Sequence, residues 1–175
     1  MKLILLGNAG AGKSTLARRL LERQSAEARL TEAHPTERLS LDQVAFAGSS
    51  ERLPLEESLE AARRWLEGRR SWIIEGCYAD IIRPLLPLCD QLIFLNPGVE
   101  VCEAHCRARP WEPEKFPTRQ EQEQHLEALL AWVRTYPIRS DDYGLASHRA
   151  LFEAFTGRKC ECTDPRQYEQ LELPG

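Results

Sequence analysis

The sequence of 175 residues lacks long apolar runs, and no stretch approaches the ~18 consecutive apolar residues of a membrane-spanning helix. It also lacks the pattern of a signal peptide, because the apolar run from Leu3 to Leu6 is short and ends at a glycine. Internal repeats and low-complexity segments are missing as well. These absences argue against a membrane span and a repeat architecture. They predict one cytoplasmic domain over residues 1–175.

An excess of positive charge is missing too, since the formal net charge is -4. A protein that binds the phosphates of nucleic acid generally needs a basic surface. Net charge does not show where the charges lie, so a local basic pocket stays compatible with this value. The charge balance nevertheless argues against nucleic acid as a partner and leaves small molecules as the expected ligands.

Cysteine is present six times, at positions 77, 89, 102, 106, 160 and 162, but without the secretion signal that usually accompanies disulfides. The closely spaced Cys102, His105 and Cys106 leave a zinc site open as an alternative. A structural zinc ion needs four ligands, usually with a Cys-x-x-Cys pair. Cys160 and Cys162 are expected to point to opposite faces of a strand, which would prevent joint chelation. We therefore expect reduced thiols without a metal.

Segments that fit strands alternate with segments that fit helices, a pattern typical of an α/β fold with a parallel sheet. Strands are expected at Leu3–Leu6, Leu39–Leu41, Trp72–Ile74, Gln91–Leu95 and Lys159–Cys162. Helices are expected from Lys13 to about Ala28, from Leu55 to Gly68, through Ile81 and Ile82, from Val99 to about Ala108, from Thr118 to about Tyr136, from Ser140 to Gly157, and after Thr163-Asp164-Pro165. Three prolines, at 110, 113 and 117, predict a loop between two of these helices.

The most specific motif directly follows the first expected strand. Residues 7–14 read Gly-Asn-Ala-Gly-Ala-Gly-Lys-Ser and match G-x-x-x-x-G-K-[ST], a phosphate-binding loop or P-loop. Small residues let backbone N–H groups converge on phosphate oxygens, and the positive end of the following helix faces the same anion. The motif's lysine contacts the β- and γ-phosphates, and its serine hydroxyl binds Mg²⁺. ATP and Mg²⁺ are therefore expected to contact Gly7, Asn8, Ala9, Gly10, Ala11, Gly12, Lys13, Ser14 and Thr15.

Charged residues elsewhere indicate which reaction the P-loop takes part in. Asp42 follows the second expected strand and Glu75 the third, and ligands bind at the carboxyl ends of parallel strands. We interpret Glu75 as a partner of Ser14 in organising Mg²⁺, or as a proton acceptor, and Asp42 as the group that orients or deprotonates a phosphate acceptor. Each of them could instead be an ordinary turn, cap or surface carboxylate. Three arginines flank the proline-rich loop and are candidates for stabilising a transferred phosphoryl group, unless they are simply surface side chains: Arg107, Arg109 and Arg139.

These segments resemble the adenylate kinase and shikimate kinase group of small P-loop kinases, through the P-loop, Glu75-Gly76 and the run Arg139-Ser140-Asp141-Asp142. The sequence is most similar to the DNA topology modulation protein-like putative kinases. Those carry a Leu-Asp step and a Trp-Ile-Ile-Asp-Gly-x-Tyr segment, which correspond here to Leu41-Asp42 and to residues 72–78. The chain departs from adenylate kinases at Ala79, where they place an arginine for AMP, and it lacks the glycine triplet of shikimate kinases.

The resemblance implies a P-loop NTPase three-layer α/β/α sandwich with a five-stranded parallel sheet in the order 2-3-1-4-5. It also implies an acceptor-binding region at about 43–70, a helical lid at about 107–139, and an adenine site near residues 163–166. We therefore expect an ATP- and Mg²⁺-dependent phosphotransferase, monomeric or homodimeric, that acts on a nucleotide, a nucleoside or another small molecule. The alternative is a nucleotide-dependent regulatory NTPase without a small-molecule acceptor.

Overall fold

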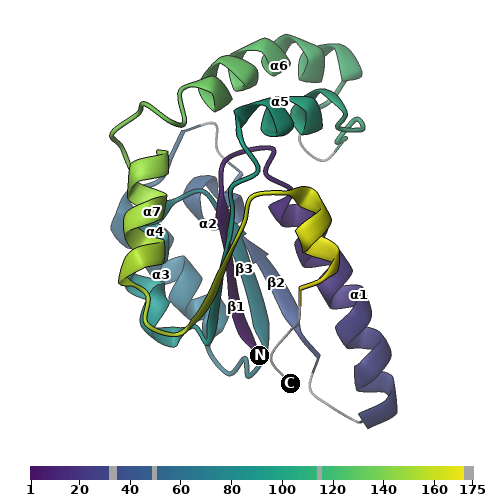
Figure 1. Cartoon of the computed structure of the whole chain (residues 1–175), viewed down its shortest axis with the longest axis vertical. Helices are drawn as coiled ribbons and strands as arrows, with labels where there is room; N and C mark the ends of the chain where they lie inside the picture. The colour runs from purple at the N-terminus through teal and green to yellow at the C-terminus, as the bar shows by residue number, and fades with distance from the viewer. Residues whose placement is uncertain (32–34, 49–50, 114–115, 172–175) are drawn as a thin grey trace.

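The computed structural model describes residues 1–31, 35–48, 51–113 and 116–171. Within these ranges five strands form an all-parallel sheet in the order β2-β3-β1-β4-β5, with seven α-helices around it (Figure 1). The parallel sheet confirms the α/β class that the sequence predicted, and its strand order is the one that the resemblance implied. The strands are β1 (Lys2–Gly7), β2 (Glu37–Ser40), β3 (Trp72–Gly76), β4 (Gln91–Leu95) and β5 (Arg158–Cys162).

The helices follow the strands in alternation, as expected for parallel pairing. They are α1 (Lys13–Thr31), α2 (Leu41–Phe46), α3 (Leu55–Leu66), α4 (Ala79–Leu85), α5 (Val99–Arg107), α6 (Arg119–Arg134) and α7 (Leu145–Ala154), with short 3-10 helices η1 (Leu86–Leu88) and η2 (Pro165–Glu169). No helix in the described part of the chain has the length and apolar character needed to cross a membrane.

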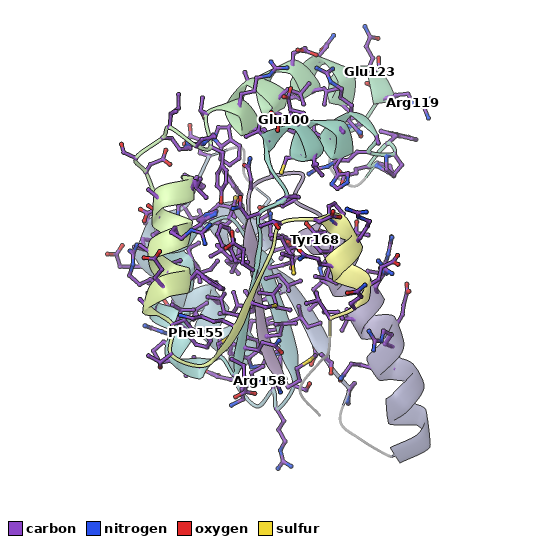
Figure 2. The ribbon with its side chains drawn as sticks, viewed as in Figure 1. Glu100, Arg119, Glu123, Phe155, Arg158 and Tyr168 are labelled. Carbon is purple, nitrogen blue, oxygen red and sulfur yellow. The ribbon has the colours of Figure 1, made fainter. Side chains whose placement is uncertain are left out.

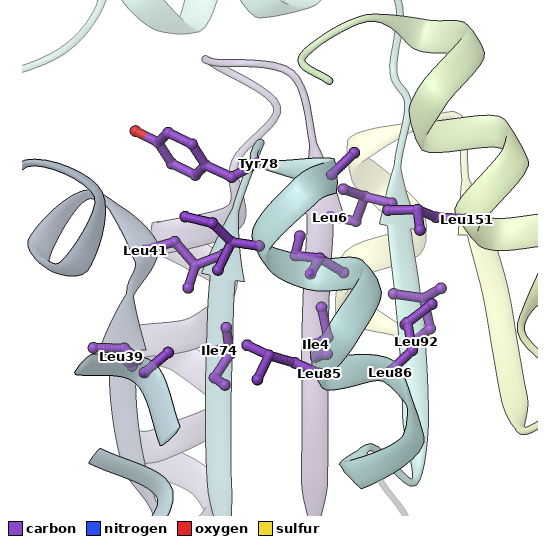
Figure 3. Packing of buried hydrophobic residues seen from close by; sticks show 14 of the residues in the cluster. Ile4, Leu6, Leu39, Leu41, Ile74, Tyr78, Leu85, Leu86, Leu92 and Leu151 are labelled. Atoms are coloured by element: carbon purple, nitrogen blue, oxygen red, sulfur yellow. The ribbon is translucent and has the colours of Figure 1, made fainter. Parts of the chain in front are cut away.

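The central strands are apolar on both faces because helices cover both sides of the sheet. Along β1 the side chains alternate: Ile4 and Leu6 pack with α2, α3, α4 and α7, whereas Leu3 and Leu5 pack with α1 and with parts of α5 and α6. Figure 3 shows the first cluster from close by, with Ile4, Ile74 and Leu92 on three adjacent strands. Burial of each such side chain contributes about 1.5–3 kcal/mol, so this core holds the strand ends in register.

The carboxyl edge of the sheet lies beneath α5 and α6. Figure 1 shows these two helices above the ends of the strands, with α1 on one face of the sheet and α3, α4 and α7 on the other. Thr118 caps α6, because its hydroxyl accepts a hydrogen bond from the Glu121 N–H at 3.2 Å. The helices therefore cover the edge at which the sequence placed its candidate site.

Several predicted boundaries were wrong. Residues 41–46 form helix α2 rather than the end of a strand, so Asp42 lies in the first helical turn, where free N–H groups favour a carboxylate. Helix α7 begins at Leu145 rather than Ser140, because the preceding residues turn at Gly144, where a β carbon would lie 2.3 Å from the Arg139 carbonyl oxygen. The helix ends at Ala154, so Gly157 does not terminate it.

Candidate functional site

The loop between β1 and α1, predicted to bind phosphate, surrounds the ammonium group of Lys13. Lys13 Nζ donates hydrogen bonds to the carbonyl oxygens of Gly7 at 3.0 Å and Asn8 at 2.8 Å, and the residue is 8% exposed. Gly10 has φ 77°, in the left-handed region that favours glycine. A β carbon there would also lie 2.2 Å from the Cys102 carbonyl oxygen. Glycine is therefore required at this position both for its conformation and for its small size.

Three elements that are distant in the sequence support the loop from outside. His105 Nδ1 on α5 lies 2.8 Å from the Gly10 carbonyl oxygen, and Tyr168 of η2, labelled in Figure 2, donates from Oη to the Ala11 carbonyl oxygen at 2.9 Å. The Asn8 side chain donates to the carbonyl oxygen of Val133, at the end of α6, at 3.2 Å. These contacts hold the loop in place and join it to the helices above the sheet.

Ser14 and Glu75 meet beside the loop. Ser14 Oγ donates to Glu75 Oε1 at 3.0 Å, and the same oxygen accepts from Arg38 Nη2 at 3.0 Å. Glu75 is 3% exposed, at the end of β3. A hydroxyl and a carboxylate are oxygen ligands of the kind that Mg²⁺ takes together with phosphate and water oxygens. The residues present thus fit a Mg²⁺–nucleotide complex, in which Ser14 at the start of α1 and Glu75 at the end of β3 would be the protein ligands.

Asp42 is held by a neighbouring phenol. Tyr78 Oη donates to Asp42 Oδ1 at 2.5 Å. Burial raises the pKa of Tyr78 well above its usual value, and the nearby Cys77 and Asp42 raise it further. The phenol therefore keeps its proton at any ordinary pH and acts only as a donor toward the carboxylate. One oxygen of Asp42 is fixed in this way, which orients the rest of the carboxylate.

Aromatic rings and two arginines extend from Asp42 and Tyr78 to Trp132 on α6. The guanidinium carbon of Arg52 lies 5.4 Å from the centre of the Tyr78 ring and 5.2 Å from that of Tyr143. The guanidinium of Arg139 lies 4.4 Å from the Trp132 ring and 5.3 Å from the Tyr143 ring. Arg52 Nε and Arg139 Nη1 are buried without a hydrogen-bond partner. Buried donors of this kind are uncommon in folded proteins.

Three of the predicted residues lie around the half-buried thiol of Cys77. Burial raises the pKa of Cys77 to about 11; Lys13 acts to lower it, and Asp42 and Glu75 act to raise it. Cys77 follows directly after β3, at the carboxyl edge of the sheet. Glu75 accepts a hydrogen bond from Ser14, the neighbour of Lys13, and Leu41 packs against Gly76, so Lys13, Asp42 and Glu75 lie near one another at this edge.

The three predicted arginines do not share one location. Arg139 lies among the aromatic rings near Asp42 and forms a two-bond ion pair with Asp141. Arg107 pairs with Glu127 at 3.3 Å, and Arg109 lies 4.0 Å from Glu112, so both ion pairs join them to residues of the lid.

Arg107 and Arg109 line a cavity of about 300 Å³ between α5 and α6, together with Trp111 and Arg119. Figure 2 shows Arg119 and Glu123 at the outer end of α6. The predicted lid includes residues 114–115 and the predicted acceptor region includes 49–50, which lie outside the described residues. Helices α5 and α6 flank residues 114–115, and helices α2 and α3 flank residues 49–50.

The cysteines serve packing in the described structure. All six are free thiols, and no group of three or more His, Cys, Asp or Glu side chains in the described ranges is placed to hold a metal. Cys102 and Cys106 are buried next to Gly10. The expectation that Cys160 and Cys162 point to opposite faces was wrong: both pack against one apolar cluster, because residues two apart in a strand share a face.

The sequence reasoning did not identify Arg38. It included Arg52 only as one residue of the expected acceptor-binding region, and it used Tyr78 only as part of a resemblance. Each of these side chains finds its partner across 28 or more residues, so no local pattern marks them. No model of a known protein family matches this chain, and no curated protein matches it significantly. A function is therefore inferred from the arrangement of the residues at the carboxyl edge of the sheet.

Proposed function

We propose that this protein is an ATP- and Mg²⁺-dependent phosphotransferase that transfers the γ-phosphate to a nucleotide, a nucleoside or another small molecule. The observation that carries this proposal is the placement of Asp42 and its phenol partner beside the P-loop, at one edge of the sheet. A regulatory NTPase needs the phosphate-binding loop but does not need a second, oriented carboxylate next to it. The site thus has one half suited to a phosphate donor and another suited to an acceptor.

On the donor side, Lys13 and the backbone N–H groups of the loop bind the phosphates. Lys13 Nζ now contacts two loop carbonyl oxygens, which it can exchange for phosphate oxygens without leaving the loop. The positive end of α1 adds to this attraction for anions. Bound with the nucleotide, Mg²⁺ would offset the negative charge of the phosphates. Ser14 and Glu75 supply its protein oxygens.

On the acceptor side, Asp42 is placed to orient a hydroxyl or to accept its proton. Tyr78 already donates a hydrogen bond to Oδ1. Oδ2 is therefore the oxygen that can accept a hydrogen bond or a proton from the hydroxyl of the phosphate acceptor. Arg52 and Arg139 bring positive charge to the same edge, each already paired with an aspartate, Asp80 or Asp141. Their charge suits the negative charge that an acceptor and a transferred phosphoryl group would share. Helices α5 and α6 above the edge help to keep water, the competing acceptor, away from the site.

The direct test is a screen of ATP consumption against nucleosides, nucleotides, sugars and small acids. We expect at least one compound to raise ADP formation above the rate with water alone, and Lys13→Ala to abolish this activity by orders of magnitude. Asp42→Asn should lose the acceptor-dependent rate but keep ATP binding. Asp90→Asn is the matched control, because Asp90 accepts from the Lys2 N–H at the opposite edge of the sheet.

One result would count against a phosphotransferase. If ATP binds but no compound of the library raises turnover above the rate with water, the regulatory NTPase becomes the better explanation. If Asp42→Asn and the Asp90→Asn control both keep the full acceptor-dependent rate, Asp42 is not the acceptor group. The first result concerns the reaction as a whole, and the second concerns only the role of one carboxylate.

A further inference from the structure

Glu75 carries its charge in an almost fully buried position. Its side chain is 4% exposed, whereas that of Arg38, which donates to it, is 33% exposed. Strand β2 pairs with β3 so that Ser40 lies opposite Glu75 and Arg38 lies opposite Ile73. Arg38 therefore lies two residues before Ser40 on β2, and its side chain extends along the strand direction to reach Glu75. The register of the two strands creates this contact.

An ionised carboxylate is costly to bury unless an opposite charge and hydrogen bonds compensate it. Among the described residues, Arg38 is the one basic side chain that forms an ion pair with Glu75. The neutral Ser14 hydroxyl contributes a hydrogen bond but no charge. Arg38 thus provides the countercharge that compensates the burial of the Glu75 carboxylate.

We propose that Arg38 is the resident counter-ion of Glu75 and that it prevents the nucleotide-free protein from binding a divalent cation by itself. This inference rests on the proposed function, in which Ser14 and Glu75 hold Mg²⁺ together with a nucleotide. Arg38 balances Glu75, and Lys13 on the neighbouring loop is a second cation that balances Asp42, the other carboxylate at this edge. A divalent cation alone meets a site without net negative charge. A triphosphate supplies the missing negative charge, so the metal enters with the nucleotide.

The reasoning predicts a gain of metal binding when Arg38 loses its charge. Removal of one positive charge within a few ångströms of Glu75 should strengthen divalent-cation binding about tenfold or more, since such charges interact strongly at an effective dielectric constant near 20. A purely structural arginine would behave differently. Its loss would loosen Glu75, so metal binding would weaken or stay unchanged.

The chain offers a matched control on the same edge strand. Arg69 Nη2 donates to Glu37 Oε2 at 3.1 Å, close to the 3.0 Å between Arg38 Nη2 and Glu75 Oε1. The Glu37 side chain is 48% exposed, and Glu37 lies at the other end of β2 from the P-loop. Arg69→Met removes an arginine ion pair of the same sheet without changing the charge near Ser14.

The experiment is a titration of the nucleotide-free protein with Mn²⁺, followed by the loss of the free-ion electron paramagnetic resonance signal. We expect Arg38→Met to bind Mn²⁺ at least about tenfold more tightly than wild type. Arg38→Lys, which keeps the charge, and Arg69→Met should stay within about twofold of wild type. The double variant Arg38→Met with Glu75→Gln should lose the gain, because the carboxylate that holds the metal is gone.

Two results would overturn the proposal. One is an Arg38→Met protein whose Mn²⁺ affinity is unchanged or weaker; the other is a gain of affinity that persists when Glu75→Gln is added. If Arg38→Met does not fold, Arg38→Gln is titrated in its place, with the rise in melting temperature on adding Mn²⁺ as a second measurement. A smaller rise than in wild type would likewise contradict the proposal.

This titration involves neither an acceptor nor turnover, so its failure is distinct from failure of the phosphotransferase proposal. A gain of Mn²⁺ binding without any acceptor in the screen would leave Arg38 as the counter-ion of Glu75 and would contradict only the transfer reaction. Acceptor-dependent activity with unchanged Mn²⁺ binding would contradict only the role of Arg38.

Discussion

Protonation of His148 is expected to destabilise the folded protein as the pH falls from 7.5 to 5. The imidazole is fully buried. Its Nε2 lies 3.0 Å from the Cys77 carbonyl oxygen, so Nε2 carries the proton and donates. Nδ1 then accepts from Tyr136 Oη at 2.9 Å. A neutral ring satisfies both contacts, whereas a second proton would place an uncompensated charge in the core.

The magnitude follows from the shift in pKa. Burial lowers the pKa of His148 from 6.5 to about 4; the bond to the Cys77 carbonyl acts to raise it, Lys13 and Arg139 act to lower it, and Asp141 acts to raise it. Between these two pKa values the unfolded chain binds more protons than the folded protein, so stability falls as the pH falls. The loss begins below pH 6.5, reaches about 2 kcal/mol at pH 5, and is about 3 kcal/mol once the pH is below 4.

Urea unfolding of wild type, His148→Gln and His125→Gln at pH 7.5 and pH 5 measures this contribution. The His148→Gln protein is expected to be less stable at pH 7.5, but its loss of stability on acidification should be about 2 kcal/mol smaller than that of wild type. His125 is exposed and serves as the control, so its substitution should leave the wild-type pH dependence. Carboxylates such as Asp141 and Glu161, whose pKa values are lowered, affect all three proteins alike. Equal losses in wild type and His148→Gln would refute the reasoning.

Two further predictions concern the site. Gly10→Ala and Gly48→Ala both place a side chain at a left-handed φ, 77° and 81°, but only Gly10 has a close neighbour in the path of the new β carbon. We expect Gly48→Ala to lower the free energy of unfolding by about 1–2 kcal/mol and Gly10→Ala to lower it clearly more, as measured by urea unfolding. Equal losses would show that the Cys102 carbonyl does not limit this position. Tyr78→Phe removes the hydrogen bond to the Asp42 carboxylate, which contributes about 1.5–3 kcal/mol. Acceptor-dependent turnover should therefore fall about tenfold or more, while ATP affinity stays unchanged. A parallel fall in ATP affinity would place Tyr78 on the donor side of the site.

Much of the fold could be predicted because it depends on local patterns. The strands at 3–6 and 91–95 are apolar except for Gln91, as expected for strands covered on both faces, and the structure finds β1 and β4 there. The errors occurred where a segment's conformation depends on its surroundings. Leu41–Phe46 is helical, and its buried residues Leu41, Val44 and Ala45 pack in a core built from distant segments of the chain.

Within the site, the sequence by itself determined the P-loop, because the spacing of its glycines, lysine and serine is a property of eight consecutive residues. It also placed Asp42 and Glu75 near strand ends, which meet at one edge in a parallel sheet. Only the tertiary structure decided that Arg38 neutralises Glu75 and that Tyr78 holds Asp42. These pairings depend on strand register and on burial, which raises the energetic importance of each charge and hydrogen bond. Neither quantity can be read from the residues next to each other in the chain.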